Sequence, residues 1–346
     1  MKAAYLVGPQ QFEVREVPEP EVPEDGVLLD VKACGVCGSD LRRWREGLPE
    51  GRDPYVQGHE FAGVVLAVGP QQKDYKVGDL LAVAADVHCG KCYYCQRGMY
   101  NLCENARLVG ISAGMPGGLA QKAALSGDIL TNGIIHRMPE GMSFEHAALA
   151  EPLSSVLAAH HKAETNLSHT VVVLGGGPIG CFHIAVAHAR GAKVILSEPS
   201  AERRQMAEPF HPEFVIDPFN EDVVARVREL TGGLGADIVV CANPIVATQT
   251  QAVEMVRKAG RVILFGGLPK ANPMTSLNAN RIHYDEIEVV GAFSYHPIFH
   301  EQALDVLQRG LIDGDTVITH VFSLDDVDKA FQASASGQAL KAIVKP

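Results

Sequence analysis

The distribution of apolar positions divides the chain into two stretches with different rhythms. Up to about residue 150, short runs rich in Val, Leu and Ala alternate with Gly, Pro and charged residues, as in Gly26–Ala33, Phe61–Gly69 and Gly78–Ala84. Short apolar runs bounded by turn residues predict β-strands. We therefore expect a compact all-β or α+β module here, which includes an acidic, proline-rich surface connection at Pro18–Gly26.

After about residue 152, apolar runs without alternation are each followed by a helical pattern. Buried parallel strands have this character because both of their faces are covered, so the pattern predicts a doubly wound parallel sheet of the α/β class. The expected strands are Val171–Leu174, Lys193–Ser197, Phe214–Ile216, Asp237–Cys241, Arg261–Phe265 and Ile287–Val290, and the expected helices run up to Arg190, over Ala201–Phe210 and over Asp222–Leu230.

The last fifty residues continue this alternation. A helical pattern around His300–Gln308 precedes a strand at Val317–Phe322, a helix that starts near Asp325 and a closing strand at Ala342–Val344. A chain of 346 residues exceeds what one hydrophobic core usually supports, so two domains are expected. By pattern alone, the tail extends the second domain or returns to the first.

Composition and charge narrow the possible partners. The chain is 47% hydrophobic and 21% charged, which is ordinary for a soluble globular protein. A net charge of −11 argues against binding to nucleic acid or to anionic membrane surfaces. The start of the chain is too short and too soon broken by Gly8-Pro9 for a signal peptide, and Pro178 interrupts the most apolar window. We expect a cytoplasmic protein whose clustered thiols bind metal.

Four of the eight cysteines form a compact motif. Cys89, Cys92, Cys95 and Cys103 have the spacing C-x2-C-x2-C-x7-C, and four thiolates at this spacing can close a tetrahedron around zinc. An iron–sulfur cluster is the alternative that the ligands alone leave open. Two local disulfides are disfavoured, because a reducing compartment and two-residue gaps both oppose them. The motif predicts a structural zinc site.

A second candidate metal site lies earlier in the chain. The sequence reads C-G-V-C-G-S-D from Cys34 to Asp40 and G-H-E from Gly58 to Glu60. A thiolate, an imidazole and a carboxylate form a mixed ligand set that suits zinc, and ligands held by the fold rather than by one tight loop are typical of a catalytic ion. The alternative is that Cys37 is a buried core thiol and His59 a satisfied loop histidine.

A glycine motif follows the first strand of the second stretch. The run G-G-G-P-I-G places Gly175, Gly177 and Gly180 in the pattern G-x-G-x-x-G, with Pro178 and Ile179 inside it, and Glu198 ends the next strand. These glycines let a pyrophosphate approach the backbone and the start of a helix. Glu198 would bond the adenosine ribose and repel a 2′-phosphate, which favours NAD over NADP, while Arg203 and Arg204 could soften that preference. The alternative is a glycine-rich turn without a ligand.

The candidate zinc ligands, the four-cysteine motif (the cysteine lobe) and the glycine motif follow one another in this order along the chain. Together they resemble the zinc-dependent medium-chain dehydrogenase/reductases, especially their sorbitol (polyol) dehydrogenase branch. The resemblance covers essentially the whole chain. It implies a GroES-like catalytic domain made of residues 1–152 and 291–346 and an inserted Rossmann domain at residues 153–290, so that the tail returns to the first domain. It also implies a homo-oligomer, either a dimer or a tetramer that pairs Rossmann sheet edges.

The same resemblance assigns roles to individual residues. Cys37 and His59 match residues that bind a catalytic zinc ion directly. Glu60 matches a carboxylate that either binds the ion or supports one of its ligands, and Cys34 matches a cysteine that does not bind it. Glu151, in E-P-L, is similar to the glutamate of the polyol branch that binds zinc or its water; a carboxylate at a helix start is the alternative. The segments that line the nicotinamide match Phe265, Gly267, Ala292 and Phe293.

Three positions depart from the family pattern. A histidine that passes the proton to solvent is replaced by Arg42, which keeps its proton at neutral pH, and an aromatic residue of the substrate pocket is replaced by Arg43. Ser294 stands where a polyol-binding arginine is usual. Arg42 and Arg43 could bind a carboxylate or a phosphate. The alternative, which the sequence alone favours, is two solvated surface arginines.

These observations predict a zinc-dependent, NAD-linked oxidation of a secondary alcohol of a polyol or sugar to a ketone. Zinc would acidify the hydroxyl, Ser39 would pass its proton to a ribose hydroxyl, and hydride would go to the nicotinamide. Substrate contacts are expected from Ser39, Arg43 and Glu151. One alternative is a dehydrogenase of the same design for a phosphorylated polyol or an anionic hydroxy or amino acid, as in threonine dehydrogenases. Another is a non-catalytic nucleotide-binding protein, against which Cys37, Ser39, His59 and Glu198 argue.

Overall fold

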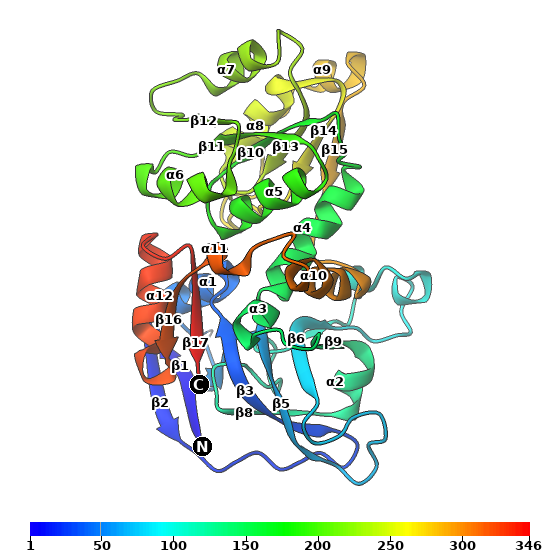
Figure 1. The fold of residues 1–346 in the computed structure, drawn as a ribbon, viewed down its shortest axis with the longest axis vertical. Coiled ribbons are helices and arrows are strands. Elements are labelled where there is room, and N and C mark those ends of the chain that lie inside the picture. The colour runs from blue at the N-terminus through cyan, green and yellow to red at the C-terminus, as the bar shows by residue number, and fades with distance from the viewer. Residues whose placement is uncertain (49) are drawn as a thin grey trace. The chain divides into compact units, whose positions relative to one another are not determined.

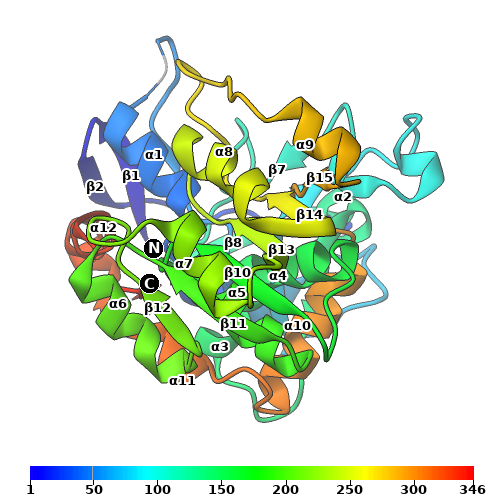
Figure 2. The ribbon, with the colours of Figure 1, turned by 90° about the horizontal axis from the view of Figure 1, so that it is seen from above.

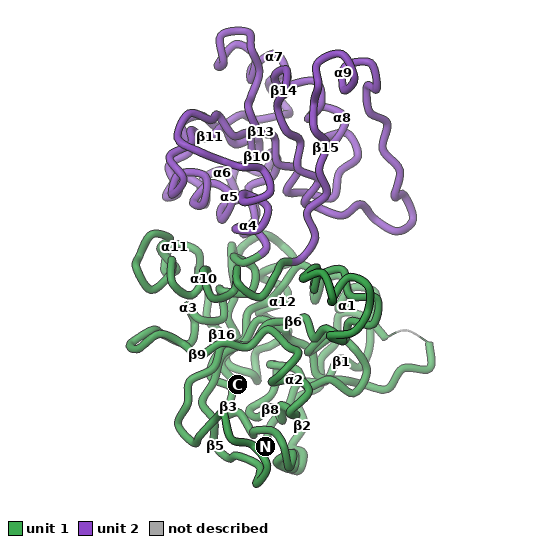
Figure 3. Tube along the Cα trace, turned by 90° about the vertical axis from the view of Figure 1, so that its right-hand side faces the viewer, with its two compact units in different colours: residues 1–154, 295–346 green, residues 155–294 purple. Residues whose placement is uncertain are grey.

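The chain folds into two compact units (Figure 3). The computed structural model describes residues 1–48 and 50–346. Unit 1 comprises Met1–Ser154 and Tyr295–Pro346, and unit 2 comprises Ser155–Ser294. The C-terminal segment therefore belongs to the same unit as the N-terminus. The unit boundaries lie after residue 154 and before residue 295, whereas the sequence placed them after 152 and before 291.

Unit 1 is built on two β-sheets (Figure 1). The order in the eight-stranded sheet is β16 (Ile318–Ser323), β17 (Lys341–Lys345), β3 (Val27–Gly35), β5 (Phe61–Val68), β6 (Leu80–Val87) and β7 (Arg107–Leu108), with β8 (Lys122–Leu125) paired to β3 and β9 (Gly133–Arg137) paired to β6. The three-stranded sheet has the order β2 (Gln11–Glu16), β1 (Lys2–Gly8) and β4 (Tyr55–Val56). The last strand of the chain, β17, runs antiparallel to β3, which leads into the Cys37 segment.

The core of unit 1 forms from inward-facing positions of these strands. Leu29 and Val31 of β3, Phe61 and Val65 of β5, and Leu81 of β6 are buried, as the two-residue period of a strand requires. A helix of the C-terminal segment closes this core through Phe331, whose ring lies 4.7 Å from that of Phe12 and 5.9 Å from that of Trp44. The α-helices that start in unit 1 are α1 (Gly38–Glu46), α2 (Gly127–Asn132), α3 (Phe144–Ala148), α4 (Ala150–Lys162), α10 (Ile298–Gln308), α11 (Gly314–Val317) and α12 (Val327–Ser336).

Unit 2 is a doubly wound α/β structure. Its six strands are all parallel in the order β12 (Phe214–Ile216), β11 (Lys193–Ser197), β10 (Thr170–Leu174), β13 (Ala236–Cys241), β14 (Val256–Leu264) and β15 (Glu288–Gly291). Helix α5 (Pro178–Ala189) packs against β10 and β11, and α8 (Val246–Met255) packs against β13 and β14 (Figure 2). The other helices are α6 (Ala201–Ala207), α7 (Val223–Leu230) and α9 (Ala279–Tyr284). The expected parallel sheet is confirmed, and β11 and β12 have the predicted bounds.

Short 3-10 turns complete the described structure at Cys95–Arg97, Tyr100–Leu102, Glu208–Phe210 and Leu324–Asp326. Within residues 1–48 and 50–346, no helix combines the length and the apolar character that crossing a membrane requires.

Candidate active site

Three predicted ligands meet in unit 1. The ligand atoms of Cys37, His59 and Glu60 all lie within 4.8 Å of one another. Cys37 is the N-cap of α1, whereas His59 and Glu60 directly precede β5, so a helix start and a strand start hold the group from two sides. His59 is 3% exposed and Glu60 is fully buried. The fold therefore brings together residues that are 22 and 23 positions apart in the sequence.

A carboxylate on the first turn of α1 lies beside His59. Oδ1 of Asp40 lies 3.3 Å from Nδ1 of His59, and Oδ2 of Asp40 accepts the backbone N–H of Cys37 at 3.4 Å. Burial lowers the pKa of His59, but the charges of Asp40 and Cys37 outweigh it and raise that pKa well above its ordinary value. The other ring nitrogen, Nε2, lies 3.4 Å from Oγ of Ser39, which is also 3.4 Å from Sγ of Cys37.

Behind Glu60 lies a buried lysine. Nζ of Lys341 on β17 forms an ion pair with Oε2 of Glu60 and donates to the Val36 carbonyl at 3.1 Å. Burial lowers the pKa of Lys341, but the Glu60 charge outweighs it and leaves that pKa raised. The second oxygen, Oε1 of Glu60, is buried and has no hydrogen-bond partner in the described structure. A thiolate, an imidazole and this oxygen suit a zinc ion, which would satisfy that oxygen.

Glu151, the fourth predicted ligand, lies outside the three-residue group. It stands in the first turn of α4, and its Oε1 accepts a hydrogen bond of 3.2 Å from the hydroxyl of Tyr295, which is 4% exposed. Burial raises the pKa of Glu151 to about 8, and the charge of Glu60 adds to this rise while that of His59 opposes it. Glu151 is thus a helix-start carboxylate that lies close enough to His59 and Glu60 for their charges to act on its pKa.

The four cysteines of the second motif also meet in unit 1. The Sγ atoms of Cys89, Cys92, Cys95 and Cys103 lie within 4.8 Å of one another, and all eight cysteines of the chain are free, so the disulfide alternative is wrong. The backbone N–H of Cys89 donates to Sγ of Cys103 at 3.2 Å. Backbone hydrogen bonds, first that from Lys91, lower the pKa of Cys89 to about 6, whereas burial raises that of Cys95 to about 12. Backbone donors aimed at sulfur suit a thiolate site.

In unit 2, the glycine motif joins β10 to α5. Gly175 has a φ of +112°, and Gly177 is the N-cap of α5, with Pro178 and Ile179 in its first turn. A Cβ on Gly180 would collide with the carbonyl oxygen of Gly175, so only glycine permits this close turn. The helix start and its backbone N–H groups form the arrangement that binds a pyrophosphate.

Glu198 has a more specific role than the sequence indicated. It follows β11, is 2% exposed, and accepts the N–H of Gly176 at Oε2 (2.6 Å) and the N–H of Ser200 at Oε1 (2.8 Å). The carboxylate therefore fixes the glycine turn and keeps a negative charge beside it. Arg204 donates to the Glu198 carbonyl at 2.9 Å and pairs with Asp217 at 3.0 Å, while Arg203 is half-buried on α6.

The segments expected beside a nicotinamide follow the next strands of this sheet. Phe265 and Gly267 come after β14, and Ala292 and Phe293 come after β15, so all four lie at the edge where the glycine turn also lies. Parallel strands present their carboxyl ends at one edge, which is where ligands of open α/β sheets bind. The ring of Phe265 packs edge-on against that of the buried His183, with 4.7 Å between centroids.

The two arginines of α1 differ in their surroundings. Arg42 is exposed, whereas Arg43 is half-buried, and its Nη1 donates to the Ser39 carbonyl at 3.3 Å. Arg42 is thus exposed, as expected of a solvated surface arginine, whereas Arg43 is partly buried. Ser39 and Arg43, two of the predicted substrate residues, are neighbours on one face of α1.

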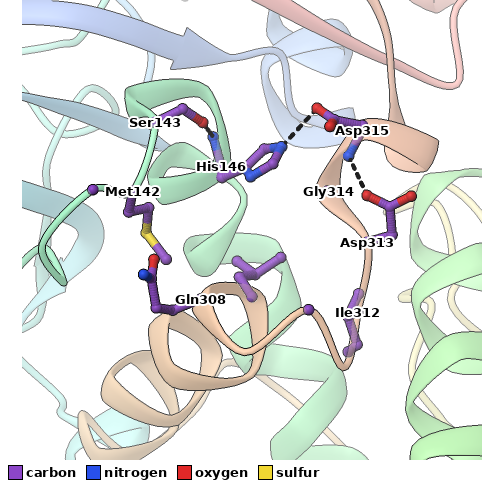
Figure 4. A pocket seen from close by; sticks show the side chains of 11 residues that line it. Met142, Ser143, His146, Gln308, Ile312, Asp313, Gly314 and Asp315 are labelled. Atoms are coloured by element: carbon purple, nitrogen blue, oxygen red, sulfur yellow. Dashed lines mark hydrogen bonds and ion pairs between the residues drawn. The ribbon is translucent and has the colours of Figure 1, made fainter.

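A pocket of about 560 Å³ lies elsewhere in unit 1, where the start of α3 meets the loop between α10 and α11 (Figure 4). Its polar groups bind one another: Ser143 caps the N–H of His146 at 3.2 Å, His146 contacts Asp315 at 2.8 Å, and Asp313 accepts the N–H of Asp315 at 3.0 Å. None of the predicted site residues lines it. We therefore place the candidate active site at the metal-ligand group rather than in this pocket.

Asp40, Lys341 and Tyr295 were not predicted. Asp40 stands in the same seven-residue motif as Cys37, at the third position of the helix, so a capping pattern could have revealed it. Lys341 and Tyr295 are separated from Glu60 and Glu151 by 281 and 144 positions, and no local pattern connects them.

Two family models match the chain. The alcohol dehydrogenase GroES-like domain matches residues 23–134, and the zinc-binding dehydrogenase model matches residues 178–309. The first model lies in unit 1, which carries both groups of metal ligands, and the second covers most of unit 2.

Several known proteins resemble the chain over nearly its full length. A sorbitol dehydrogenase of Halalkalibacterium halodurans is 33% identical, covering 98% of this chain and 97% of the relative. A D-arabitol-phosphate dehydrogenase of Enterococcus avium is 32% identical over 98% and 95%, and an L-threonine 3-dehydrogenase of Pyrococcus horikoshii is 33% identical over 95% and 94%. A zinc-binding dehydrogenase of Sinorhizobium meliloti 1021, solved with NADP, superposes with a TM-score of 0.91 at 30% identity, covering 100% of this chain and 99% of that one.

Proposed function

This chain belongs to the zinc-dependent medium-chain dehydrogenase/reductase family, in the group that includes sorbitol dehydrogenases, and we propose that it oxidises a secondary alcohol of a polyol or sugar with NAD. The observation that carries the proposal is the group of Cys37, His59 and Glu60, whose ligand atoms lie within 4.8 Å of one another. Three protein ligands of this mixed kind are typical of a catalytic zinc ion, because a fourth position stays available to substrate.

Cys37 and His59 would hold the ion, and Glu60 would offer its buried Oε1 to it. When bound, zinc supplies a Lewis acid that lowers the pKa of the substrate hydroxyl. Asp40, whose Oδ1 lies 3.3 Å from Nδ1 of His59, would hold the ring in place while Nε2 gives up its proton to bind the ion. Lys341 forms an ion pair with Glu60 and so balances its charge in a buried position.

Two further groups act on the substrate in this proposal. Oγ of Ser39, 3.4 Å from both Cys37 and His59, is placed to accept the proton of the alcohol. Glu151, held by the Tyr295 hydroxyl, binds a neighbouring hydroxyl group or water. A polyol presents several such hydroxyls, and each is recognised best by a fixed acceptor or donor.

The preferred coenzyme of the proposal is NAD. The carboxylate of Glu198 is held beside the glycine turn by two backbone N–H groups, so an approaching 2′-phosphate would meet a fixed negative charge. Arg204, one of the two arginines that could compensate, is already paired with Asp217. The related Sinorhizobium protein binds NADP, which makes a direct comparison of the two coenzymes necessary.

The substrate class follows from what the relatives share. Their names include sorbitol, D-arabitol phosphate and L-threonine, which are chemically different compounds that all carry a secondary alcohol. We infer that the conserved chemistry is oxidation of such an alcohol to a ketone, and that residues around the ligand group choose the compound. Identification of the compound therefore requires a panel rather than one candidate.

The test is a panel of neutral and phosphorylated polyols, scored by NADH absorbance at 340 nm, with and without a chelator. We expect turnover of at least one secondary alcohol, loss of that turnover with the chelator, and its recovery with added Zn²⁺. Retention of full turnover by a Cys37→Ala, His59→Ala double variant would contradict the proposal. NAD and zinc binding without reduction of NAD by any alcohol would support the non-catalytic alternative.

We also infer a cytoplasmic homo-oligomer. All eight cysteines are free, as suits a reducing compartment, and β15 is an edge strand of the six-stranded sheet to which a second copy could add. Size-exclusion chromatography with light scattering would determine the assembly, with a dimer or tetramer as the expected result.

A further inference from the structure

Three buried polar side chains of unit 2 form a hydrogen-bonded group, the histidine cluster of His160, Thr165 and His183. His160 lies on α4, Thr165 follows that helix, and His183 lies on α5. Nδ1 of His160 lies 2.8 Å from Oγ1 of Thr165, and its Nε2 lies 3.1 Å from Nδ1 of His183. All three are at most 5% exposed. The proposed mechanism gives none of them a role.

The cluster ends on Phe265, one of the residues expected beside the nicotinamide. The rings of His183 and Phe265 meet edge-on, with 4.7 Å between centroids and 88° between planes. This arrangement is favoured because the positive edge of one ring meets the negative face of the other, so the orientation of each ring constrains the other. A fixed His183 therefore fixes the ring of Phe265.

His183 also lies behind the glycine motif. It is four positions after Ile179, which stands in the first turn of α5, and residues four apart lie on the same face of a helix. Ile179 and Phe265 are half-buried, whereas His183 is fully buried. One interior side chain thus belongs to the helix whose start would bind the pyrophosphate and touches the segment expected beside the nicotinamide.

The cluster is costly if its only purpose is to fill the core. Burial lowers the pKa of His160 to about 3 and that of His183 well below its ordinary value, so at neutral pH each ring offers one N–H donor and one acceptor nitrogen. Within residues 1–48 and 50–346, Nε2 of His183 has no hydrogen-bond partner. An apolar side chain would fill the same space without taking polar atoms out of water. Directed hydrogen bonds instead hold the His183 ring in one orientation.

We propose that the histidine cluster positions the coenzyme: its hydrogen bonds hold the Phe265 ring in the orientation that supports the nicotinamide. This inference rests on the proposed function, from which it takes the dinucleotide. The cluster acts on the nicotinamide end alone, because the glycine turn is held separately by the carboxylate of Glu198. Loss of the cluster therefore weakens the binding of NADH but not that of ADP-ribose, which lacks the nicotinamide.

The experiment measures the Kd of the zinc-loaded protein for NADH by fluorescence and for ADP-ribose by calorimetry; if NADPH binds more tightly, NADPH and the 2′-phosphate of ADP-ribose replace them. His183→Leu removes the ring beside Phe265, and His160→Leu removes the hydrogen bond that holds this ring. Each should raise the Kd for NADH by about 5- to 20-fold and change that for ADP-ribose by less than about 2-fold. His160→Gln, whose amide can replace Nε2, should restore most of the affinity that His160→Leu loses.

Two matched controls make the same change outside the cluster. His161→Leu alters the adjacent, exposed position of α4, and His188→Leu alters a half-buried histidine of α5 that pairs with Glu213 at 3.2 Å. Both should leave the two Kd values within about 2-fold of the wild type. The melting temperature of every variant, measured without coenzyme, shows that it is folded.

A double-mutant cycle asks whether the cluster acts through Phe265. Phe265→Leu alone should raise the Kd for NADH, and His183→Leu added to it should raise that Kd by less than about 2-fold more, because the ring it acts on is gone. If His183 only stabilised the fold, the two effects would multiply. The cycle can also be closed with His160→Leu, so it does not depend on the folding of one variant.

The outcomes separate the two proposals. An unchanged Kd for NADH in both His183→Leu and His160→Leu, equal losses for NADH and ADP-ribose, or multiplying effects in the cycle would overturn the positioning role and leave the proposed function intact. Failure of the wild type to bind NADH, NADPH and ADP-ribose would overturn the proposed function and this inference with it.

Discussion

The two groups of candidate metal ligands in unit 1 differ in chemical type and in spacing along the sequence. The four cysteines of the lobe lie within fifteen residues of sequence, share one chemical type and can fill a tetrahedron by themselves. The active group has only three ligands, which differ in chemical type and come from two segments of the chain: Cys37, His59 and Glu60. A closed set holds a metal for structure, whereas an incomplete set leaves room for a reacting molecule.

The two groups also differ in the kind of protein groups that surround them. In the lobe, backbone N–H groups face the sulfurs, as that of Cys89 faces Cys103, and they lower the pKa of Cys89 to about 6. Around the active group, the supporting residues are buried side chains: Asp40 belongs to the same motif as Cys37, whereas Lys341 and Tyr295 come from the C-terminal segment. A local backbone suffices to hold a structural ion, but the fold is needed to tune a catalytic one.

Removal of a ligand from the active group should have the largest effect on turnover. We expect His59→Ala to lower kcat by on the order of 10³-fold or more, because the Lewis acid is lost, while the melting temperature changes by only a few degrees. Steady-state kinetics and thermal unfolding of the same preparation measure both. A variant that keeps a tenth of the wild-type kcat would break the assignment.

Removal of a ligand from the lobe should act on stability instead. Cys95→Ser is expected to lower the melting temperature by about 5–10 °C, because binding of a structural metal contributes to folding. The folded fraction should retain normal kcat. Cys181→Ala, which removes a buried thiol outside both groups, is the control and should leave the metal content unchanged. Loss of kcat without loss of stability in Cys95→Ser would reverse the two roles.

The charge at Glu198 should control the coenzyme. Glu198→Gln keeps an acceptor for the Gly176 N–H but removes the negative charge, so the ratio of kcat/KM for NADP to that for NAD should rise by about 10-fold. Glu202→Gln removes an exposed charge from α6, the helix that begins three residues after Glu198, and should leave the ratio within about 2-fold. An unchanged ratio in Glu198→Gln would show that other groups select the coenzyme.

Two buried histidines of unit 2 should make the protein sensitive to acid. Nε2 of His160 lies 3.1 Å from Nδ1 of His183; burial lowers the pKa of His160 to about 3 and that of His183 well below its ordinary value. Above about pH 6.5 both are neutral whether the chain is folded or not. Below it the unfolded chain takes up protons that the folded chain refuses, so the free energy of unfolding should fall by about 1 kcal/mol per pH unit for each histidine.

Urea unfolding between pH 4 and pH 8 measures this slope. His160→Gln should reduce it, whereas His161→Gln, a change at the adjacent exposed position, should not. Equal slopes in the wild type and both variants would mean that the acid sensitivity comes from other groups, such as the buried His300 of unit 1, whose pKa burial lowers to about 3.

The smallest expected effect concerns the residue behind Glu151. Tyr295→Phe removes one hydrogen bond from Oε1 of Glu151 and should lower kcat/KM by about 2- to 10-fold. Tyr284→Phe, which alters the hydroxyl of a tyrosine that is 75% exposed in unit 2, should have no measurable effect. Equal results for the two variants would show that the Tyr295 hydroxyl does not position the carboxylate.

The comparison also explains what the sequence could reveal. Both ligand groups and the glycine motif depend on short spacings, such as that from Cys89 to Cys103, and the structure brings these residues together. The parallel strands were predicted because buried strands are continuous apolar runs. Helix α8 was missed because its sequence, V-A-T-Q-T-Q-A-V-E-M, mixes polar residues with β-branched ones and has a weak helical period.

The supporting contacts could not be predicted from local patterns. The Lys341–Glu60 pair joins the last strand to a residue 281 positions earlier, and only the pairing of β17 with β3 brings the two together. Glu198 was expected to contact a ribose, yet it also holds the glycine turn, since Gly176 lies within reach only once β10 and β11 are paired. These contacts depend on tertiary structure, so spacing carries no sign of them.

The most direct test follows zinc content and turnover together while the metal is removed stepwise with a chelator. The account predicts two zinc ions per chain at the start, one for each group of ligands. Turnover should disappear as the content falls from two to one, with the melting temperature nearly unchanged, and stability should fall only with the second ion. Full turnover at one zinc per chain, or loss of activity only together with loss of structure, would contradict the account.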